Sequence, residues 1–482
     1  MNGEFPWVIV GSGPSGCAAA ESLVRRGIVP IILDGGIEAR REVSQSGIGT
    51  RAEPGKKAWF GSVASYAQPD AVDLAYAPEV LARASFGLGG FSRVWGGTVD
   101  LPEDWSSWPI DARPDVGDLQ VLSAVLPQAE TAWGDDAIRE GFRVPGAPAA
   151  ARAMRLFQRA SEGGRWDVRA SRVAIQTGDS SPRPCQPCGR CLSGCERDAI
   201  WFAGEPILTR AREGVVDYRP GVIVRRVEEL DDSAVLHVLW PDGSTGQITA
   251  GRVLIGAGAI SSAAIAVSSH VADSLVLRDT GTAFTAAISM RAEVKGSGLH
   301  HGLSNWWIKD RHDQFMAQVY PPTEEHADRL ASRMPGGSHW LYPARVLARQ
   351  LHPIVAYQAV ADSDSLVVEW VGGQVGVRIQ SSLASRAAFV SRLSRLSRAF
   401  RKAGYLLPVS STEFSPAGTG YHSGASLPHG VGTDALGRPH GMRRTHFIDA
   451  TVLPAISVGS MTPTVMVNAI RIARQCVEEG AA

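Results

Sequence analysis

The sequence predicts an α/β protein with a Rossmann-like domain assembled from separated segments and an α+β domain with a mainly antiparallel sheet. Three observations support this fold class. The chain opens with a strand, a glycine-rich turn and a helix, and related patterns return near its middle and its C-terminus. Between them, SLVVEWVGGQVGVRI alternates and turns at Gly372–Gly373, as a hairpin does. The following segment predicts an amphipathic helix with Phe389, Leu393, Leu396 and Phe400 on one face.

The start of the chain has the pattern of a dinucleotide site. WVIV is a short buried-strand pattern, GSGPSG follows at once, and CAAAESLVRRG has apolar residues at helical spacing. A second strand, VPIILD, ends in an acid placed to bind a ribose hydroxyl. The alternative is a purely structural turn, and the pattern alone does not choose between FAD and NAD. The candidate cofactor contacts here are Gly11, Gly13, Ser15, Gly16 and Asp34.

Composition and charge point to a small-molecule partner. Lys plus Arg and Asp plus Glu both number 48 among 482 residues, so no excess positive charge attracts nucleic acid or an anionic membrane. The longest weakly polar run, VLIGAGAISSAAIAV, is too short for a membrane span, and the N-terminus lacks the features of a cleaved export signal. We expect a cytoplasmic protein without nucleic-acid or membrane partners.

Two further motifs carry a family resemblance. FGLGGFSRVWGG, residues 86–97, and HFIDATVLPAISVGSMTPTVMVNAIRIA, residues 446–473, together with GSGPSG, resemble the glucose-methanol-choline (GMC) family of flavin oxidoreductases. VLIGAGAISSAAI, residues 253–265, is similar to the family's internal strand, turn and helix behind the adenine half of the cofactor. The motifs are spread over the chain in the family's order. The resemblance implies that the cofactor is FAD.

The resemblance also implies where FAD contacts the chain. The glycine-rich segment would pass beside the flavin ring, and the C-terminal strand and helix would close over the ribityl chain and the ring. An FAD-binding domain would comprise residues 1–150, 200–267 and 410–482, and residues 268–409 would form the substrate-binding domain. The implied cofactor contacts are Gly89, Gly90, Trp95, Gly96, Gly97, Val222, Ala257, Asp449, Ala450 and Thr464.

The resemblance implies two catalytic positions over the flavin. GMC enzymes place a histidine there, which takes the alcohol proton while hydride moves to flavin N5, and a second residue that is usually histidine or asparagine. GYHSGAS puts His422 at the first position, whereas Thr462 departs from the family at the second. A threonine hydroxyl can hydrogen-bond a substrate oxygen, but it is no second base. Asn468 is a candidate replacement, with a structural amide as the alternative.

Four of the six cysteines lie in CQPCGRCLSGC, within a predicted cluster-binding loop at residues 178–200. The spacing C-x2-C-x2-C-x3-C is that of bacterial ferredoxins, with Glu196 in place of proline. It favours an iron–sulfur cluster, of 4Fe-4S type. Zinc is the alternative, and it is less favoured because zinc sites more often pair two cysteine knuckles that are separated by a longer connection. Free or disulfide-bonded cysteines are a third interpretation. The candidate ligands are Cys185, Cys188, Cys191 and Cys195.

Together these features predict an FAD-dependent dehydrogenase. It would oxidise a CH–OH group of a sugar, amino sugar, cyclitol or related alcohol, and electrons would pass through the cluster to an external acceptor or redox protein. The substrate class follows from the family alone. Two alternatives are a zinc-stapled FAD alcohol oxidase that uses oxygen and a flavin-binding protein without turnover. The segment HHGLSNWWIKD offers four candidate sugar contacts, which are His301, Asn305, Trp306 and Trp307. Core packing explains the two tryptophans equally well.

Overall fold

The structure is a computed structural model. It describes residues 6–36, 74–102, 105–133, 143–161, 164–178, 183–193, 195, 197–290, 299–323, 346–358 and 360–481.

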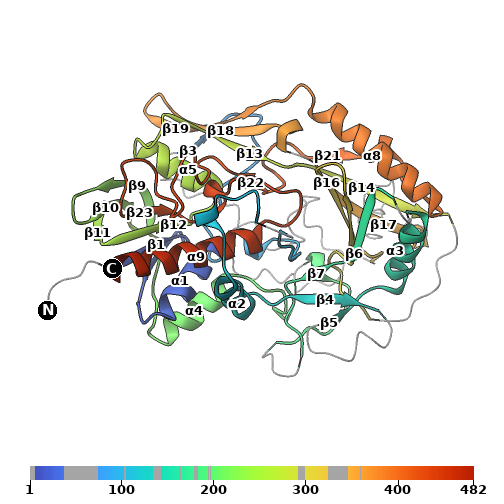
Figure 1. The fold of residues 1–482 in the computed structure, drawn as a ribbon, viewed down its shortest axis with the longest axis horizontal. Helices are drawn as coiled ribbons and strands as arrows, with labels where there is room; N and C mark the ends of the chain where they lie inside the picture. The colour runs from blue at the N-terminus through green and yellow to red at the C-terminus, as the bar shows by residue number, and fades with distance from the viewer. Residues whose placement is uncertain are drawn as a thin grey trace.

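A five-stranded parallel sheet forms the centre of the first domain, in the order β23–β12–β1–β2–β8. Helix α1 packs along α9, and α4 and α2 lie beside them (Figure 1). Strands from distant parts of the sequence share this sheet, so the predicted assembly from separated segments is confirmed. The elements are β1 Trp7–Val10, α1 Pro14–Val24, β2 Ile31–Asp34, α2 Val116–Val125, α4 Gly204–Arg212, β8 Asp217–Pro220, β12 Arg252–Ile255, β23 Thr445–Phe447 and α9 Thr462–Ala481.

Two more sheets pack into the same hydrophobic core. One is a three-stranded antiparallel sheet, and the other has the order β22–β13–β18–β19–β3. The predicted hairpin at Gly372–Gly373 is confirmed as β18–β19, with both glycines at positive φ. Residues 268–409 therefore contribute to the first core as well as to the second domain. The elements are β3 Leu74–Tyr76, β9 Ile223–Glu229, β10 Ala234–Leu239, β11 Thr245–Ala250, α5 Ala259–Ser268, β13 Ser274–Asp279, β18 Ser365–Val371, β19 Gln374–Gln380 and β22 Ser423–Gly424.

The second domain is built on an antiparallel sheet of order β20–β14–β17–β16–β15–β6, with β21 beside β14. Helices α3 and α8 cover one face of it, at the right of Figure 1. The predicted apolar face of α8 is buried there, and the predicted mainly antiparallel domain is confirmed. The elements are α3 Pro148–Ala160, β6 Trp166–Ala170, β14 Gly281–Ser289, β15 Trp306–Asp310, β16 Phe315–Val319, β17 Leu351–Gln358, α8 Ser385–Lys402, β20 Tyr405–Leu406 and β21 Glu413–Phe414.

A small sheet and several short 3-10 helices complete the described elements. The sheet has the order β5–β4–β7. Its strands are β4 Ala129–Ala132, β5 Arg143–Pro145 and β7 Arg172–Val173, and the 3-10 helices are η2 Gly90–Arg93, η3 Ile110–Ala112, η5 Cys191–Ser193, η7 Val360–Asp362, η8 Val409–Ser411 and η9 Ala450–Val452.

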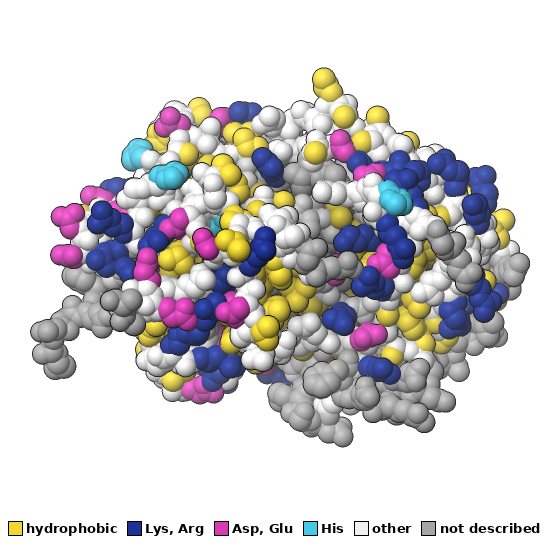
Figure 2. Space-filling view, viewed as in Figure 1, with side chains coloured by type: hydrophobic (Ala, Val, Ile, Leu, Met, Phe, Trp, Pro, Cys, Tyr) yellow, Lys and Arg dark blue, Asp and Glu magenta, His cyan; other side chains and the backbone are white. Residues whose placement is uncertain are grey.

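The outer face of α8 is basic. Figure 2 shows Lys and Arg side chains gathered over this helix, where Arg386, Arg398 and Arg401 are exposed. Arg392 is instead buried and pairs with Asp313 at 2.9 Å. No helix in the described ranges is long and apolar enough to cross a membrane.

Candidate active site and cysteine loop

The glycine turn between β1 and α1 leaves open space at one of its three glycines. A Cβ on Gly11 would lie 2.5 Å from the carbonyl oxygen of Gly256, and one on Gly16 would lie 2.0 Å from that of Gly11. Close packing therefore accounts for both residues. A Cβ on Gly13 would meet no protein atom within 4 Å. Open backbone at the N-terminus of a helix is what the approach of a pyrophosphate requires.

Asp34, at the end of β2, is buried and connects the turn to its neighbours. Its Oδ2 accepts hydrogen bonds from the backbone N–H and the hydroxyl of Ser12, at 2.8 and 2.6 Å. Its Oδ1 accepts one from the N–H of Gly36 at 2.7 Å and a longer one from the hydroxyl of Tyr218 at 3.3 Å. Burial raises the pKa of Asp34, and these donors oppose that effect. The long contact with Tyr218 is the one that a ribose hydroxyl could most easily replace.

Three further predicted cofactor contacts lie around the same sheet edge. The backbone N–H of Val222 donates to the carbonyl of Asp34 at 3.0 Å. Ala257 follows β12 and leads into α5, and Ser15 is buried near the carbonyl of Gly256. The structure thus brings these predicted positions to the carboxyl ends of the parallel strands, where ligands of open α/β sheets bind.

A cavity of about 700 Å³ borders this edge, between β9, α5 and the β18–β19 hairpin. Phe86 lines it, and the carbonyl of Phe86 would lie 2.6 Å from a Cβ on Gly35, next to Asp34. The hydroxyl of Ser261, also in the lining, is buried without a hydrogen-bond partner among the described residues. The lining includes none of Gly13, Asp34, Val222 and Ala257, so this cavity lies beside the predicted cofactor contacts and is not formed by them.

The glycine-rich segment Gly89–Gly97 starts against the glycine turn. Gly89 donates its N–H to the hydroxyl of Ser12 at 2.8 Å, and a Cβ on Gly90 would lie 3.4 Å from the Cα of Gly13. Trp95 donates its indole N–H to the carbonyl of Trp201 at 2.9 Å. The glycine turn and the glycine-rich segment, two of the predicted cofactor-binding segments, therefore lie in contact.

The end of this segment reaches the second domain. A Cβ on Gly96 would lie 3.2 Å from the hydroxyl oxygen of Tyr320, and one on Gly97 would lie 2.9 Å from the side chain of Leu303. The segment thus runs from the nucleotide-binding turn to the antiparallel sheet. A ligand that follows it would contact both domains.

The C-terminal motif contains a carboxylate that is hydrogen-bonded within the protein and a hydroxyl group without a partner among the described residues. Asp449 is buried and accepts hydrogen bonds from the N–H of Gly258 at 2.9 Å and the hydroxyl of Ser262 at 2.5 Å. Its other oxygen accepts bonds from Thr451, so any ligand contact near Asp449 and Ala450 would fall to the backbone. Thr464 has a buried hydroxyl without a hydrogen-bond partner in the described part of the chain.

His422 stacks on Tyr357, with ring centroids 5.0 Å apart and an angle of 17° between the planes. Burial lowers the pKa of His422 to about 4. Its Nδ1 is buried and has no hydrogen-bond partner among the described residues, which leaves Nε2 for a ligand. At neutral pH this imidazole is uncharged and able to accept a proton.

The segment around His422 is strained and anchored by a carboxylate. Tyr421 and Ala425 have φ values of +56° and +50°, and residues other than glycine rarely adopt such values. Asp279 accepts hydrogen bonds from the N–H of Gly418 and the hydroxyl of Ser423, both at 2.8 Å. Asp279 was not predicted from the sequence. Its contact arises because the end of β13 pairs with β22, and no local motif marks it.

Thr462 is the first residue of α9, and the residues before it lie near the His422 site. Val458 packs in one cluster with Met316 and Tyr357. A Cβ on Gly459 would lie 2.9 Å from the sulfur of Met316. The start of α9 and His422 therefore approach the same face of the antiparallel sheet.

Asn468 belongs to a structural network. Its Oδ1 accepts a hydrogen bond from Arg471 at 2.8 Å, and Nε2 of His429 lies 3.3 Å from the same oxygen. These side-chain contacts favour the structural alternative for Asn468, and its Nδ2 is buried without a hydrogen-bond partner among the described residues.

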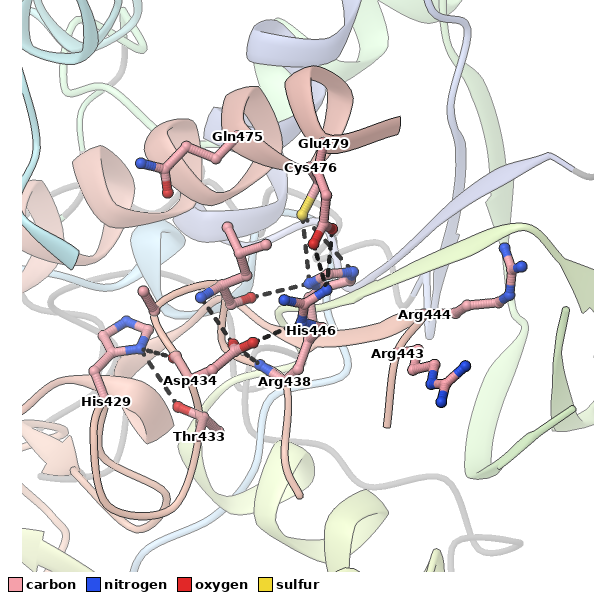
Figure 3. Close-up of polar contacts among 12 residues, drawn as sticks. His429, Thr433, Asp434, Arg438, Arg443, Arg444, His446, Gln475, Cys476 and Glu479 are labelled. Atoms are coloured by element: carbon pink, nitrogen blue, oxygen red, sulfur yellow. Dashed lines mark hydrogen bonds and ion pairs between the residues drawn. The ribbon is translucent and has the colours of Figure 1, made fainter. Parts of the chain in front are cut away.

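Two other histidines near the C-terminus are held by internal contacts (Figure 3). His429 donates from Nδ1 to the carbonyl of Asp434 at 2.8 Å, and His446 donates to that of Leu436 at 3.0 Å. The sulfur of Cys476, on α9, lies 3.4 Å from Nδ1 of His446. These contacts fasten the segment before β23 to α9, and they distinguish both histidines from His422.

His301 and Asn305 form a second internal network. The Nε2 of His301 lies 3.0 Å from the hydroxyl of Thr131 and 3.2 Å from the amide nitrogen of Asn305. Burial lowers the pKa of His301 to about 3. Trp306 is also fully buried, so these three residues have no surface for a sugar. Of this motif, Trp307 alone packs with Tyr357.

The structure brings the four cysteines of the loop together. Cys191 is buried, Cys185 and Cys195 pack against the same hydrophobic cluster, and Cys188 is exposed. Each of the other three thiols, when ionised, raises the pKa of Cys191. Cys191 accepts a hydrogen bond from the N–H of Gly302 at 3.2 Å, and Cys195 accepts one from that of Ala199 at 3.3 Å. Within the described ranges, no group of three or more His, Cys, Asp or Glu residues is arranged to hold a single metal ion.

The cysteine loop packs against the end of the glycine-rich segment. Cys191, Leu303 and Tyr320 belong to one buried cluster. Leu303 is also the residue that faces Gly97, and Tyr320 faces Gly96. Two buried side chains thus connect the predicted flavin segment with the predicted cluster ligands.

Comparison with known proteins supports the fold. No family model and no curated protein sequence matches the chain. The crystal structure of pyridoxine 4-oxidase from Mesorbium loti matches it with a TM-score of 0.62 at 14% sequence identity, over 98% of this chain and 99% of that one. The chain shares the fold of this oxidase. The similarity covers both domains, including the sheet that carries Tyr320 and Tyr357.

Proposed function

We propose that the protein is an FAD-dependent oxidoreductase of the GMC type that oxidises a CH–OH group. One observation carries the proposal: His422 stacks on Tyr357 beside Tyr320, against which Gly96 of the glycine-rich segment packs. A neutral histidine thus lies near the segment that resembles the family's flavin-contacting loop. The fold of an oxidase over the whole chain supports the same conclusion.

The residues present fit FAD. The open backbone at Gly13 suits the pyrophosphate, and Asp34 suits the adenosine ribose. The buried hydroxyls of Ser261 and Thr464 lack partners among the described residues and would gain them from the cofactor. When bound, FAD would supply the hydride acceptor.

His422 would act as the general base. Because its pKa is low, the imidazole is neutral over the working pH range and would take the proton of the substrate hydroxyl at Nε2. Tyr357 would hold the ring plane by stacking, and Asp279 would hold the backbone on both sides of His422. Thr462 would give a single orienting hydrogen bond.

The four cysteines fit an iron–sulfur cluster better than zinc. The C-x2-C-x2-C-x3-C spacing of Cys185, Cys188, Cys191 and Cys195 supports the cluster. Backbone N–H groups donate to two of the sulfurs, as they would to the thiolate ligands of a cluster. A cluster here would supply one-electron transfer to an external acceptor.

Cofactor analysis of anaerobically purified protein tests this function. Heat-denatured protein should release FAD, and iron and acid-labile sulfide should be present in matching amounts. NAD in place of FAD would contradict the proposal, and zinc without sulfide would replace the cluster by a structural zinc site.

A further inference from the structure

The two faces of the antiparallel sheet differ in character. Along β16, Phe315, Ala317 and Val319 point into the core beneath α3 and α8. Side chains alternate between the faces of a strand, so Met316 and Gln318 point to the other face. Among the described helices, none covers this second face in the way that α3 and α8 cover the first.

The second face looks toward His422 and the glycine-rich segment. Tyr357 of β17 stacks on His422, and Met316 lies beside Gly459, just before α9. Tyr320, directly after β16, faces Gly96. The face therefore forms the wall opposite the position proposed for the flavin.

One amide stands at the centre of this wall. Gln318 is 3% exposed, and its Oε1 accepts a hydrogen bond from the hydroxyl of Tyr320 at 3.3 Å. Its Nε2 makes no hydrogen bond with any described residue. This nitrogen is not one of the fully buried atoms that lack a partner, so it keeps some accessible surface for a ligand. In the strand register Trp307 lies on one side of Gln318 and Val355 on the other.

Charged groups on this face lie on the outer strands, and at the β21 edge the register places Glu413 on it. The register places Asp167 and Arg169 of β6 and Lys309 of β15 on it. Arg169 pairs with Asp167 at 2.8 Å. On this face of the two central strands, β16 and β17, the described residues include no charged side chain.

We propose that the substrate is an uncharged alcohol carried by a flat, largely apolar ring, with one hydrogen-bond acceptor that Gln318 binds through Nε2. The proposal rests on the function proposed above. A ring of this kind would lie against the accessible parts of Trp307 and Tyr357, each 8% exposed, next to the fully buried Met316. The guanidinium of Arg169 lies 5.5 Å from the centroid of the Trp307 ring, at the edge of this surface. Its carbinol carbon would lose a hydride to the flavin and its hydroxyl a proton to His422, which leaves an aldehyde or ketone.

The same wall is poorly suited to a polyol. A sugar or cyclitol has several hydroxyl groups, and each one buried without a partner weakens binding. The described wall supplies the amide of Gln318, two tyrosine hydroxyls and the imidazole of His422. The carboxylate of Asp100 lies beside Gly459 and Met316, and the hydroxyl of Thr462 is the proposed orienting group. The inference therefore narrows the range of alcohols expected from family resemblance.

Ligand binding to the FAD-loaded protein tests the inference. We would use the His422→Asn variant, in which chemistry is slowed, and measure calorimetric affinities for 4-methoxybenzyl alcohol, benzyl alcohol and myo-inositol. 4-Methoxybenzyl alcohol should bind at least about tenfold more tightly than myo-inositol. Equal or tighter binding of myo-inositol would overturn the inference. The wild-type protein with the product 4-methoxybenzaldehyde gives the same ranking if the variant does not fold.

A substitution at Gln318 tests the role of its amide. Gln318→Leu should lower the affinity for 4-methoxybenzyl alcohol about tenfold. The affinity for benzyl alcohol, which lacks the ether acceptor, should stay within about twofold of the unsubstituted value. Gln380→Leu, at the exposed end of β19, is the matched control and should change neither affinity. An equal loss for both aromatic alcohols would overturn the role of Gln318.

Flavin bleaching separates this inference from the proposed function. If the aromatic alcohols bind in the predicted order but no alcohol bleaches the flavin of the wild-type protein, the proposed function fails and the binding inference stands. If myo-inositol bleaches the flavin and binds more tightly, the function stands and the inference fails.

Discussion

The imidazole of His422 lies almost parallel to the phenol ring of Tyr357, at a centroid distance of 5.0 Å and an angle of 17°. The two residues come from different domains of the chain, on the segment before β22 and on β17. Stacking fixes the plane of an imidazole whose buried Nδ1 has no hydrogen-bond partner among the described residues. The contact therefore couples the position of the proposed base to the wall that would hold the substrate.

Replacing the proposed base should slow the chemistry and spare the cofactor. His422→Ala should keep FAD bound and slow anaerobic flavin reduction by about 10² to 10⁴, the usual cost of removing a positioned base. Thr462→Ala should have a smaller effect because it removes one hydrogen bond. Stopped-flow bleaching measures both. A larger loss in Thr462→Ala than in His422→Ala would reverse the two roles.

Tyr357 should act through its ring rather than its hydroxyl. Tyr357→Phe keeps the stacked ring, so flavin reduction should stay within about threefold of the wild type. Tyr357→Leu removes the aromatic face and should slow reduction by at least about tenfold. Equal rates in the two variants would contradict a positioning role for the stacked ring.

The protonation of Asp279 should appear in the pH profile. Burial raises the pKa of Asp279 to about 6, so below that pH its carboxyl group is neutral and holds Gly418 and Ser423 less strongly. Flavin reduction should fall as the pH drops through about 6, and fall again near 4 as His422 takes up its proton.

Two variants assign the inflection near pH 6. Asp279→Asn should abolish it because the amide does not titrate. Asp364→Asn is the matched control: Asp364 lies close enough to raise the pKa of Asp279, but it accepts its hydrogen bond from Ser382 instead of the His422 segment. It should keep an inflection, shifted to lower pH. An unchanged inflection in Asp279→Asn would assign it to another group.

Buried histidines should make the fold sensitive to acid. Burial lowers the pKa of His301 to about 3, below the usual unfolded value of about 6.5. The unfolded state therefore binds the proton first, so the stability contributed by neutral His301 is complete above pH 6.5 and is lost as the pH falls toward 3. Urea unfolding at pH 7 and 5 should show a smaller loss in His301→Gln than in the wild type. An identical loss would mean that other groups dominate.

The cysteines should separate electron transfer from flavin reduction. Cys188→Ser and Cys191→Ser should lose or alter iron while substrate still bleaches FAD, and turnover with a one-electron dye should collapse. Cys17→Ser, in α1 and remote in sequence from the loop, is the control and should keep iron. Near-normal dye turnover in a folded, iron-free variant would rule out a relay.

Local patterns explain which parts of the fold could be predicted. The turn at Gly11–Gly16, the acid at the end of β2 and the paired glycines of the β18–β19 hairpin each carry their signal within a short stretch. The apolar face of α8 was equally clear because a period of 3.6 residues is visible in eighteen consecutive residues.

The wall of the site could not be predicted in the same way. Every residue of β16 is buried, so its composition shows no alternation and does not reveal that Gln318 faces the site while Ala317 faces the core. Asp279 reaches the His422 segment through a strand pairing across more than a hundred residues. Such contacts depend on the tertiary arrangement.

The most direct test of the central claim is anaerobic mixing of the purified protein with an alcohol and with the same alcohol deuterated at the carbinol carbon. The account predicts that the flavin bands bleach in a single turnover, more slowly with the deuterated alcohol, because the C–H bond is broken as the hydride leaves. Flavin bands that stay unchanged with both aromatic alcohols and polyols would contradict it.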